Sequence, residues 1–152
     1  MTKKFLALIT LMVLTISCGF TPIYSNKNNN NFSIEQVNFT GDSTLNNFLK
    51  INLKRLKNQK SNKKYYIETK TEYKRNVLTK DNTGKITSYE LTAKATFIID
   101  SINIKLIYSE KKVMDVIDDK FEENKYEIIV KQNFATSISN KLVSDLVLLQ
   151  WF

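Results

Sequence analysis

The sequence predicts an α+β protein, a two-layer sandwich with a mainly antiparallel four-stranded sheet and two helices on one face. Two long segments, 64–79 and 86–100, alternate apolar and polar residues and are separated by a turn signal. Two others, 45–56 and 124–149, place apolar residues three and four apart, which is typical of amphipathic helices. The predicted order is β-α-β-β-β-α, so both helices can cover the same face of the sheet.

The composition excludes several classes of protein. The chain has 152 residues, enough for one domain, a single Cys and no His. These counts exclude a His-based catalytic triad, an imidazole metal site, an internal disulfide and a Cys metal cluster. Three Gly residues are too few for glycine-rich phosphate loops. We therefore expect no metal and no cofactor, and an enzyme using carboxylates or Tyr is the least favoured class.

The N-terminal residues predict a lipoprotein signal peptide over residues 1–17. Lys3 and Lys4 precede a 12-residue apolar run, too short to span a membrane, and Ser17 then precedes Cys18 in a lipobox-like pattern. We expect cleavage before Cys18 and acylation of that residue, including by palmitate. Residue 19 is Gly and not Asp, which favours the outer membrane. An ordinary cleaved signal peptide is the alternative.

Residues 18–31 are predicted to be the lipidated Cys and a flexible tether, and residues 32–152 a single domain. The tether contains the polar run SNKNNNN. Apolar residues in 32–40 alternate with one change of phase, which predicts a short, bulged strand. Residues 41–43 then provide a chain break and a helix N-cap before the amphipathic segment 45–56.

Three strands are predicted in the middle of the chain. One face of 64–79 carries Tyr and Thr residues, Ile67 and Val77, and residues 81–84 form the turn of a hairpin. The odd positions from Tyr89 to Ile99 are apolar, and a tight turn is expected at 100–103. Apolar residues lie on even positions in 104–108 but on odd positions from Val113, so we expect a bulge or strand break at 109–112.

The last predicted element is a helix that begins after an N-cap at Asn124, with Glu127 at the third helical position. Its apolar stripe is expected to be core, with Lys131 as the one polar member. The acids at 118–119 and 122–123 lack EF-hand spacing and are interpreted as a polar linker. Trp151 and Phe152 at the C-terminus could be packed or could contact a partner. The stripe runs through Phe134, Leu142, Leu146 and Leu149.

The opening of the predicted mature chain resembles a known family. Residues 18–24 read CGFTPIY, similar to the CGFxPLY opening of alphaproteobacterial lipopolysaccharide-assembly lipoproteins (LptE/RlpB-like). Residues 89–100, YELTAKATFIID, are also similar to the third strand of that family. The resemblance implies an outer-membrane lipoprotein, not an enzyme, which faces the periplasm. It implies a role as assembly partner and plug of the LptD-like β-barrel that inserts lipopolysaccharide into the outer leaflet.

The positive charge suggests where an anionic ligand could bind. The chain carries a net charge of +8, concentrated in residues 50–80. Lipopolysaccharide is anionic, so a basic hairpin could bind it, although a solvated lysine-rich face is the simpler reading. A free-standing periplasmic lipoprotein that binds an anionic ligand or inhibits an enzyme is the alternative function. Export makes nucleic acid a poor partner. The candidate lipopolysaccharide-binding residues are Lys70, Lys74, Arg75, Lys80 and Lys85.

Overall fold

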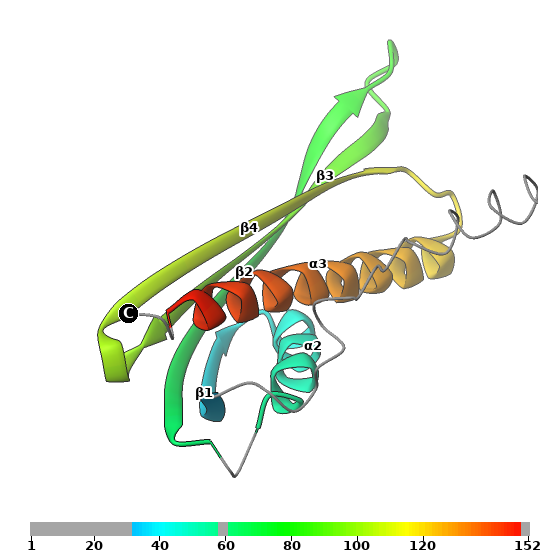
Figure 1. Cartoon of the computed structure of the whole chain (residues 1–152). Helices are drawn as coiled ribbons and strands as arrows, with labels where there is room; N and C mark the ends of the chain where they lie inside the picture. The colour runs from blue at the N-terminus through cyan, green and yellow to red at the C-terminus, as the bar shows by residue number, and fades with distance from the viewer. Residues whose placement is uncertain (1–31, 58–60, 150–152) are drawn as a thin grey trace, which may run out of the picture.

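The structure, a computed structural model, describes residues 32–57 and 61–149 (Figure 1). The predicted signal peptide, the predicted tether, Cys18 and the Trp151–Phe152 end lie outside the described residues. The elements in chain order are β1 (Phe32–Gly41), α2 (Ser43–Lys54), β2 (Lys63–Lys80), β3 (Ile86–Ile99), the short 3-10 helix η2 (Asp100–Ile102), β4 (Ile104–Asp115) and α3 (Lys120–Leu148).

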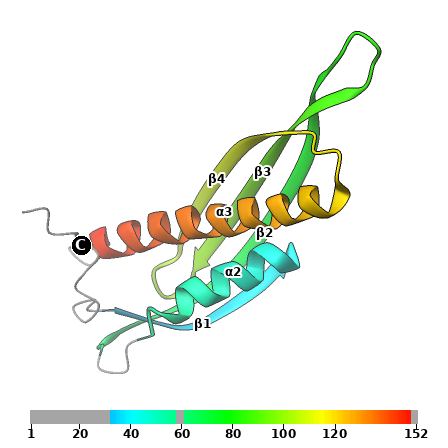
Figure 2. The same cartoon turned by 90° about the vertical axis from the view of Figure 1, so that its right-hand side faces the viewer.

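The described residues form one sheet of four strands in the order β1-β2-β3-β4. β1 pairs in parallel with β2, and the other two pairs are antiparallel. Both helices lie on the same face of this sheet and leave the other face open (Figures 1 and 2). The predicted two-layer α+β sandwich is therefore confirmed. The predicted bulge in β1 is also present, as a register shift between Ile34 and Gln36.

The core lies between the sheet and the helices. The strand residues on its inner side alternate with exposed ones, and α2 and α3 contribute one stripe each, as the spacing predicted. Asp42 caps α2 by accepting a hydrogen bond from the Leu45 backbone N–H at 2.7 Å. None of the described helices has the length and apolarity needed to cross a membrane. The largest fully buried side chains include Phe32, Leu45, Leu49, Tyr65, Leu91, Phe97, Ile138 and Leu142.

The predicted break in β4 at residues 109–112 was wrong. β4 pairs with β3 in one uninterrupted register, and Met114 is buried whereas Val113 is 52% exposed. The apolar pattern is interrupted because Glu110 occupies an inward position. There it accepts hydrogen bonds from Ser137 and Lys141 of α3. A polar residue on the inner face therefore disturbs the sequence pattern without disturbing the strand.

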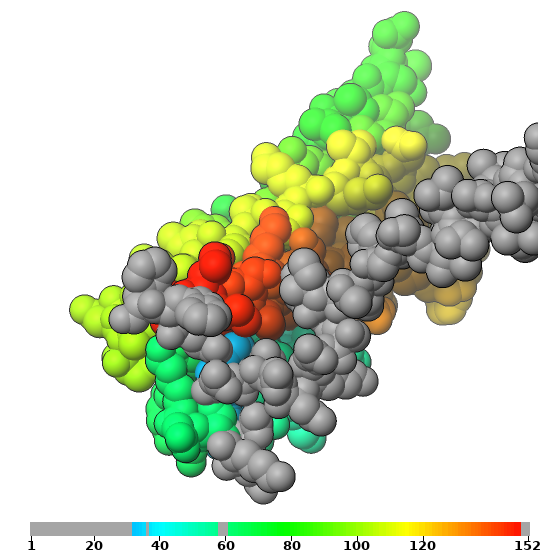
Figure 3. All heavy atoms as spheres, in the orientation of Figure 1, coloured from blue at the N-terminus to red at the C-terminus, as the bar shows by residue number. Residues whose placement is uncertain are grey.

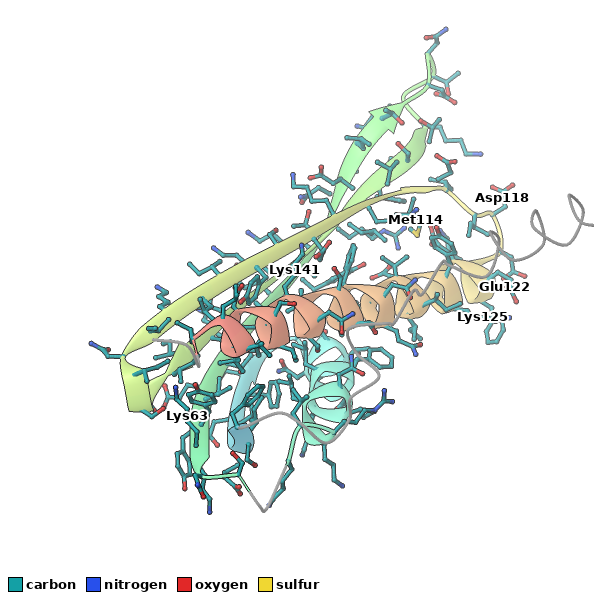
Figure 4. The ribbon with its side chains drawn as sticks, viewed as in Figure 1. Lys63, Met114, Asp118, Glu122, Lys125 and Lys141 are labelled. Atoms are coloured by element: carbon teal, nitrogen blue, oxygen red, sulfur yellow. The ribbon has the colours of Figure 1, made fainter. Side chains whose placement is uncertain are left out.

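The predicted start of the last helix was also wrong. α3 begins at Lys120, and its N-cap is Asp119, whose carboxylate accepts hydrogen bonds from the backbone N–H groups of Phe121 and Glu122. The acids that were interpreted as a linker are thus the cap and the first turn, where negative charge is favoured by the helix dipole. Figure 4 shows Asp118, Glu122 and Lys125 at this end of α3.

Gly41 lies at a point where the backbones of β1 and β2 approach too closely for a side chain. Its φ is +102°, and a Cβ built there would lie 1.8 Å from the Thr71 carbonyl oxygen. Gly84 has a φ of +83°, but nothing lies within 4 Å of its Cβ position. Gly84→Ala should cost about 1 kcal/mol of unfolding free energy from backbone strain alone. Gly41→Ala should cost about 3 kcal/mol or more, since a backbone clash is added.

Urea unfolding of the two variants, followed by circular dichroism, measures this difference. Equal midpoints for Gly41→Ala and Gly84→Ala would show that the approach of β1 to β2 imposes no constraint at residue 41.

Candidate functional site

The ends of β2 and β3 and their turn, residues 77–88, form a hairpin that projects beyond both helices (Figure 1). We call this segment the hairpin arm. In the space-filling view its end stands clear of the rest of the molecule (Figure 3). Its inner face has no helix to cover it. Val77, which the alternation places on the same face of β2 as the buried Ile67, is therefore exposed.

The turn of the hairpin arm is held by Asp81. Its Oδ1 accepts hydrogen bonds from the Thr83 backbone N–H at 2.8 Å, the Thr83 hydroxyl at 2.7 Å and the Lys85 backbone N–H at 3.0 Å. The hydrogen bond from the Thr83 hydroxyl lowers the pKa of the Asp81 carboxyl. Gly84 provides the left-handed residue that closes the turn. The tip is thus ordered by its own side chains.

The base of the hairpin arm is irregular. The register shifts between Val77 and Thr79, so Leu78 is an extra residue on β2. The Thr79 hydroxyl lies 2.6 Å from the hydroxyls of both Thr87 and Ser88, which joins the two strands beside the bulge. Val77 and Leu78 are 48% and 47% exposed. The arm therefore combines two exposed apolar side chains at its base with charged residues at its tip.

The structure does not bring the five predicted ligand residues together. Lys80 and Lys85 flank the turn of the hairpin arm and are exposed. Lys70 and Lys74 lie lower on β2, on the open face of the sheet, opposite Thr96 and Thr92 of β3. Arg75 has the opposite parity, because side chains alternate along a strand, and it points toward the helices. These positions leave binding of lipopolysaccharide by the lysines as a prediction.

The open face of the sheet carries charges of both signs. A shallow hollow at one end of it is lined by Asn38, Tyr66, Glu68, Asp100 and Ser101 among others, and its two carboxylates make it unsuitable for an anion. The lysines that alternation places on this face are Lys64, Lys70, Lys74, Lys94, Lys105 and Lys111, and the acids are Glu68, Glu72, Glu90 and Asp115.

Arg75 is fully engaged with the helix layer. Its guanidinium donates to Glu123 at 2.7 Å and to Glu127 at 3.0 Å, and it lies 3.8 Å from the centre of the Tyr89 ring. Lys120 also pairs with Glu123, at 2.9 Å. Hydrogen bonds from Lys120 and then Arg75 lower the pKa of Glu123, whose side chain is only 3% exposed. Arg75 therefore ties β2 to α3.

Lys131, the predicted polar member of the α3 stripe, makes a second connection. Its ammonium pairs with Asp42 at 3.2 Å and lies 4.0 Å from the centre of the Tyr73 ring. Burial, together with the charge of Glu127, raises the pKa of Tyr73 well above its ordinary value. Asp42 thus caps α2 and also binds α3. The predicted core stripe is confirmed at Phe134, Leu142 and Leu146, which are buried, and Leu149 is partly buried against the core.

Sequence reasoning missed Glu123 as the partner of Arg75, although a signal was present. Counting back from Phe134 and Val130 at helical spacing reaches Glu127 and then Glu123, which places both acids on the buried stripe. The described residues contain no group of three or more acidic or thiol side chains placed to hold a metal ion. The exposed lysines of the hairpin arm are available for electrostatic contacts, whereas Arg75 and Lys131 form ion pairs inside the domain.

The fold is similar to that of solved bacterial lipoproteins. Rare lipoprotein B from Shewanella oneidensis matches 76% of this chain and 99% of its own, with a TM-score of 0.53 and 17% identity. An uncharacterized lipoprotein B from Nitrosomonas europaea matches 74% of this chain and 84% of its own, with a TM-score of 0.50 and 15% identity. No protein-family model and no curated protein matches the sequence. At these identities the likeness establishes a shared fold.

The tie between β2 and α3 should dominate stability at this end of the molecule. Arg75→Ala leaves Glu123 buried with a weakened set of partners, so we expect a loss of about 3 kcal/mol of unfolding free energy. Lys74→Ala, one residue earlier but on the open face, should change it by less than about 0.5 kcal/mol. Chemical denaturation of both variants measures the contrast, and similar losses would refute it.

The same ion pair should make stability depend on pH. The folded pKa of Glu123 lies below its unfolded value of about 4.5, so its contribution is complete above that pH. The contribution is lost as the pH falls through the folded pKa. Between pH 6 and pH 3, Glu123→Gln should therefore lose less stability than the wild type. Thermal melts measure this, with the exposed neighbour Glu122→Gln as the control, which should follow the wild-type curve.

Proposed function

We propose that this chain is an outer-membrane lipoprotein that faces the periplasm and is anchored through Cys18. We further propose that it acts as assembly partner and plug of the LptD-like β-barrel that inserts lipopolysaccharide into the outer leaflet. The observation that carries the proposal is the fold shared with rare lipoprotein B over 99% of that chain. The lipobox-like pattern and the CGFTPIY opening agree with this reading.

The surfaces of the domain suit a plug. The lumen of a membrane β-barrel is polar, so an occupant needs a polar surface that does not depend on one sign of charge. The open face of the sheet meets this requirement, since it carries both lysines and carboxylates. The ties made by Arg75 and Lys131 hold the helices on the other face, so the domain can enter as one stiff body.

The hairpin arm is the element best placed to reach a ligand. It extends beyond the sandwich (Figure 1). Its turn is held by the hydrogen bonds of Asp81, and Lys80 and Lys85 flank that turn. Ammonium groups are point charges that pair with phosphate without strict geometry. We therefore propose that Lys80 and Lys85 contact the phosphates of lipopolysaccharide, and that Lys70 and Lys74 extend this contact along the open face.

Purification from membranes in mild detergent tests the assembly role. The full chain, expressed with its own N-terminus and a C-terminal affinity tag, should bring down a stoichiometric β-barrel protein. Mass spectrometry should find an acylated N-terminal Cys18. A chain that purifies alone and folded from cells that also produce the barrel protein would overturn the plug proposal, and an unmodified Cys18 would overturn the anchor.

Charge reversal on the hairpin arm tests ligand binding separately. Lys80→Glu with Lys85→Glu should weaken binding of purified lipopolysaccharide about tenfold, because two exposed ion pairs are each worth up to about 1 kcal/mol. Lys50→Glu with Lys54→Glu makes the same change in net charge on the outer side of α2 and is the matched control. Binding measured at low and high salt should show the difference shrinking as salt increases. Equal effects of the two double variants would remove the arm as the site.

A further inference from the structure

The two edges of the sheet differ in how well they could accept another strand. β1, at one edge, is interrupted by the register shift between Ile34 and Gln36. β4, at the other edge, runs for 12 residues without a bulge and pairs only with β3 in the described part of the chain. A long, regular edge strand leaves a row of backbone donors and acceptors available for pairing.

The direction of these free groups can be assigned. The Val116 backbone N–H donates to the Thr87 carbonyl at 3.0 Å, in the same register as the β3–β4 ladder. Backbone groups alternate in direction along an antiparallel strand, so the even-numbered residues of β4 bond to β3. The odd-numbered residues from Lys105 to Asp115 therefore direct their N–H and C=O groups away from the sheet.

We propose that β4 pairs antiparallel with β4 of a second copy of this chain, with the two-fold axis at Glu110, so that two sheets join into one. In this register the numbers of two facing residues add up to 220. Odd-numbered residues therefore face odd-numbered residues, as the free backbone groups require. The symmetry is that of an isologous dimer, in which one edge serves as its own partner.

The side chains across this interface are complementary. On the open face, Ile107 would lie opposite Val113, and both are 52% exposed in the single chain. Lys105 would lie opposite Asp115, and neither residue is in an ion pair within the described ranges 32–57 and 61–149. By symmetry each of these contacts occurs twice. Apolar and opposite-charge pairs facing each other are the arrangements that stabilise antiparallel strands.

Neighbouring registers lack this match. With the axis at Ser109, Ile107 would face Lys111 and Lys105 would face Val113. With the axis at Tyr108, Lys105 would face Lys111, a pair of like charges, and Ile107 would face Ser109. The axis at Glu110 is the register in which charge and apolar pairing agree.

The negative charge of Glu110, the residue on the axis, is already compensated by Lys141 of the same chain. Glu110 accepts hydrogen bonds from Ser137 at 2.7 Å and Lys141 at 2.6 Å, and its pKa is lowered by these bonds although burial acts to raise it. Figure 4 shows Lys141 on α3, on the side of β4. Two Glu110 side chains can therefore meet across the axis, each paired to its own helix. A hollow lined by Ser137, Asn140 and Ser144 beside β4 leaves room there for the second copy.

The pairing does not rest on barrel assembly, because it concerns the chain by itself. Light scattering of the full chain, overproduced without a barrel partner, purified and corrected for bound detergent, should give the mass of a dimer at micromolar concentration. Reversal of one charge, by Lys105→Asp or Asp115→Lys, should weaken dimerisation about tenfold, since like charges then face each other at two places. The double variant with both changes should restore it.

A scan of single cysteines determines the register. Only the residue on a two-fold axis meets its own copy, so disulfide formation should peak at Glu110→Cys and fall off at Tyr108→Cys and Lys112→Cys. The parent protein gives the baseline for Cys18, and Lys94→Cys, on the open face of β3, should not exceed it. A monomeric mass, a flat scan, or a double charge variant as weak as the single ones would each overturn the pairing.

Discussion

The buried ion pair between Arg75 and Glu123 is the contact on which this end of the molecule depends. It fixes the first turns of α3 over β2, just where the strands leave the sandwich to form the hairpin arm. At the other end of α3, the Tyr108 hydroxyl donates to Asp145 at 2.6 Å and Lys63 reaches the Leu149 carbonyl. The helix is thus held by polar contacts along its length, and the apolar stripe between them fills the core.

Most of the fold could be predicted from local patterns. Alternation in β3 was unambiguous because every odd position from Tyr89 to Ile99 is apolar and faces the helices. The errors arose where tertiary contacts changed the expected polarity of a position. Glu110 faces inward because α3 supplies Ser137 and Lys141 to receive it, and a pattern based on hydrophobicity cannot anticipate such partners. Asp119 lies five residues before the predicted cap, and the acids that follow it are equally typical of a polar linker.

The candidate site could be predicted only in part. Charge density identified the β2–β3 region, and the hairpin was found because its turn has a strong local signal. The grouping of Arg75 with the lysines is wrong, because adjacent residues of a strand point to opposite faces and nearness in sequence is not nearness on the surface. Arg75 could have been separated from Lys74 by that alternation alone, but its partners on α3 become visible only once the helix is placed.

The parallel pairing of β1 with β2 has a consequence for the order of folding. The chain is synthesised from its N-terminus, so β1 emerges before the strand that will accept it. Phe32 can pair only when Lys63, its register partner, has been synthesised, and α2 lies between these two residues in the chain. The meander from β2 to β4 needs no such delay, because each strand follows its partner through a short turn. β1 is thus the strand that stays unpaired longest, and its apolar side chains, such as Phe32 and Ile34, are buried only after β2 has formed.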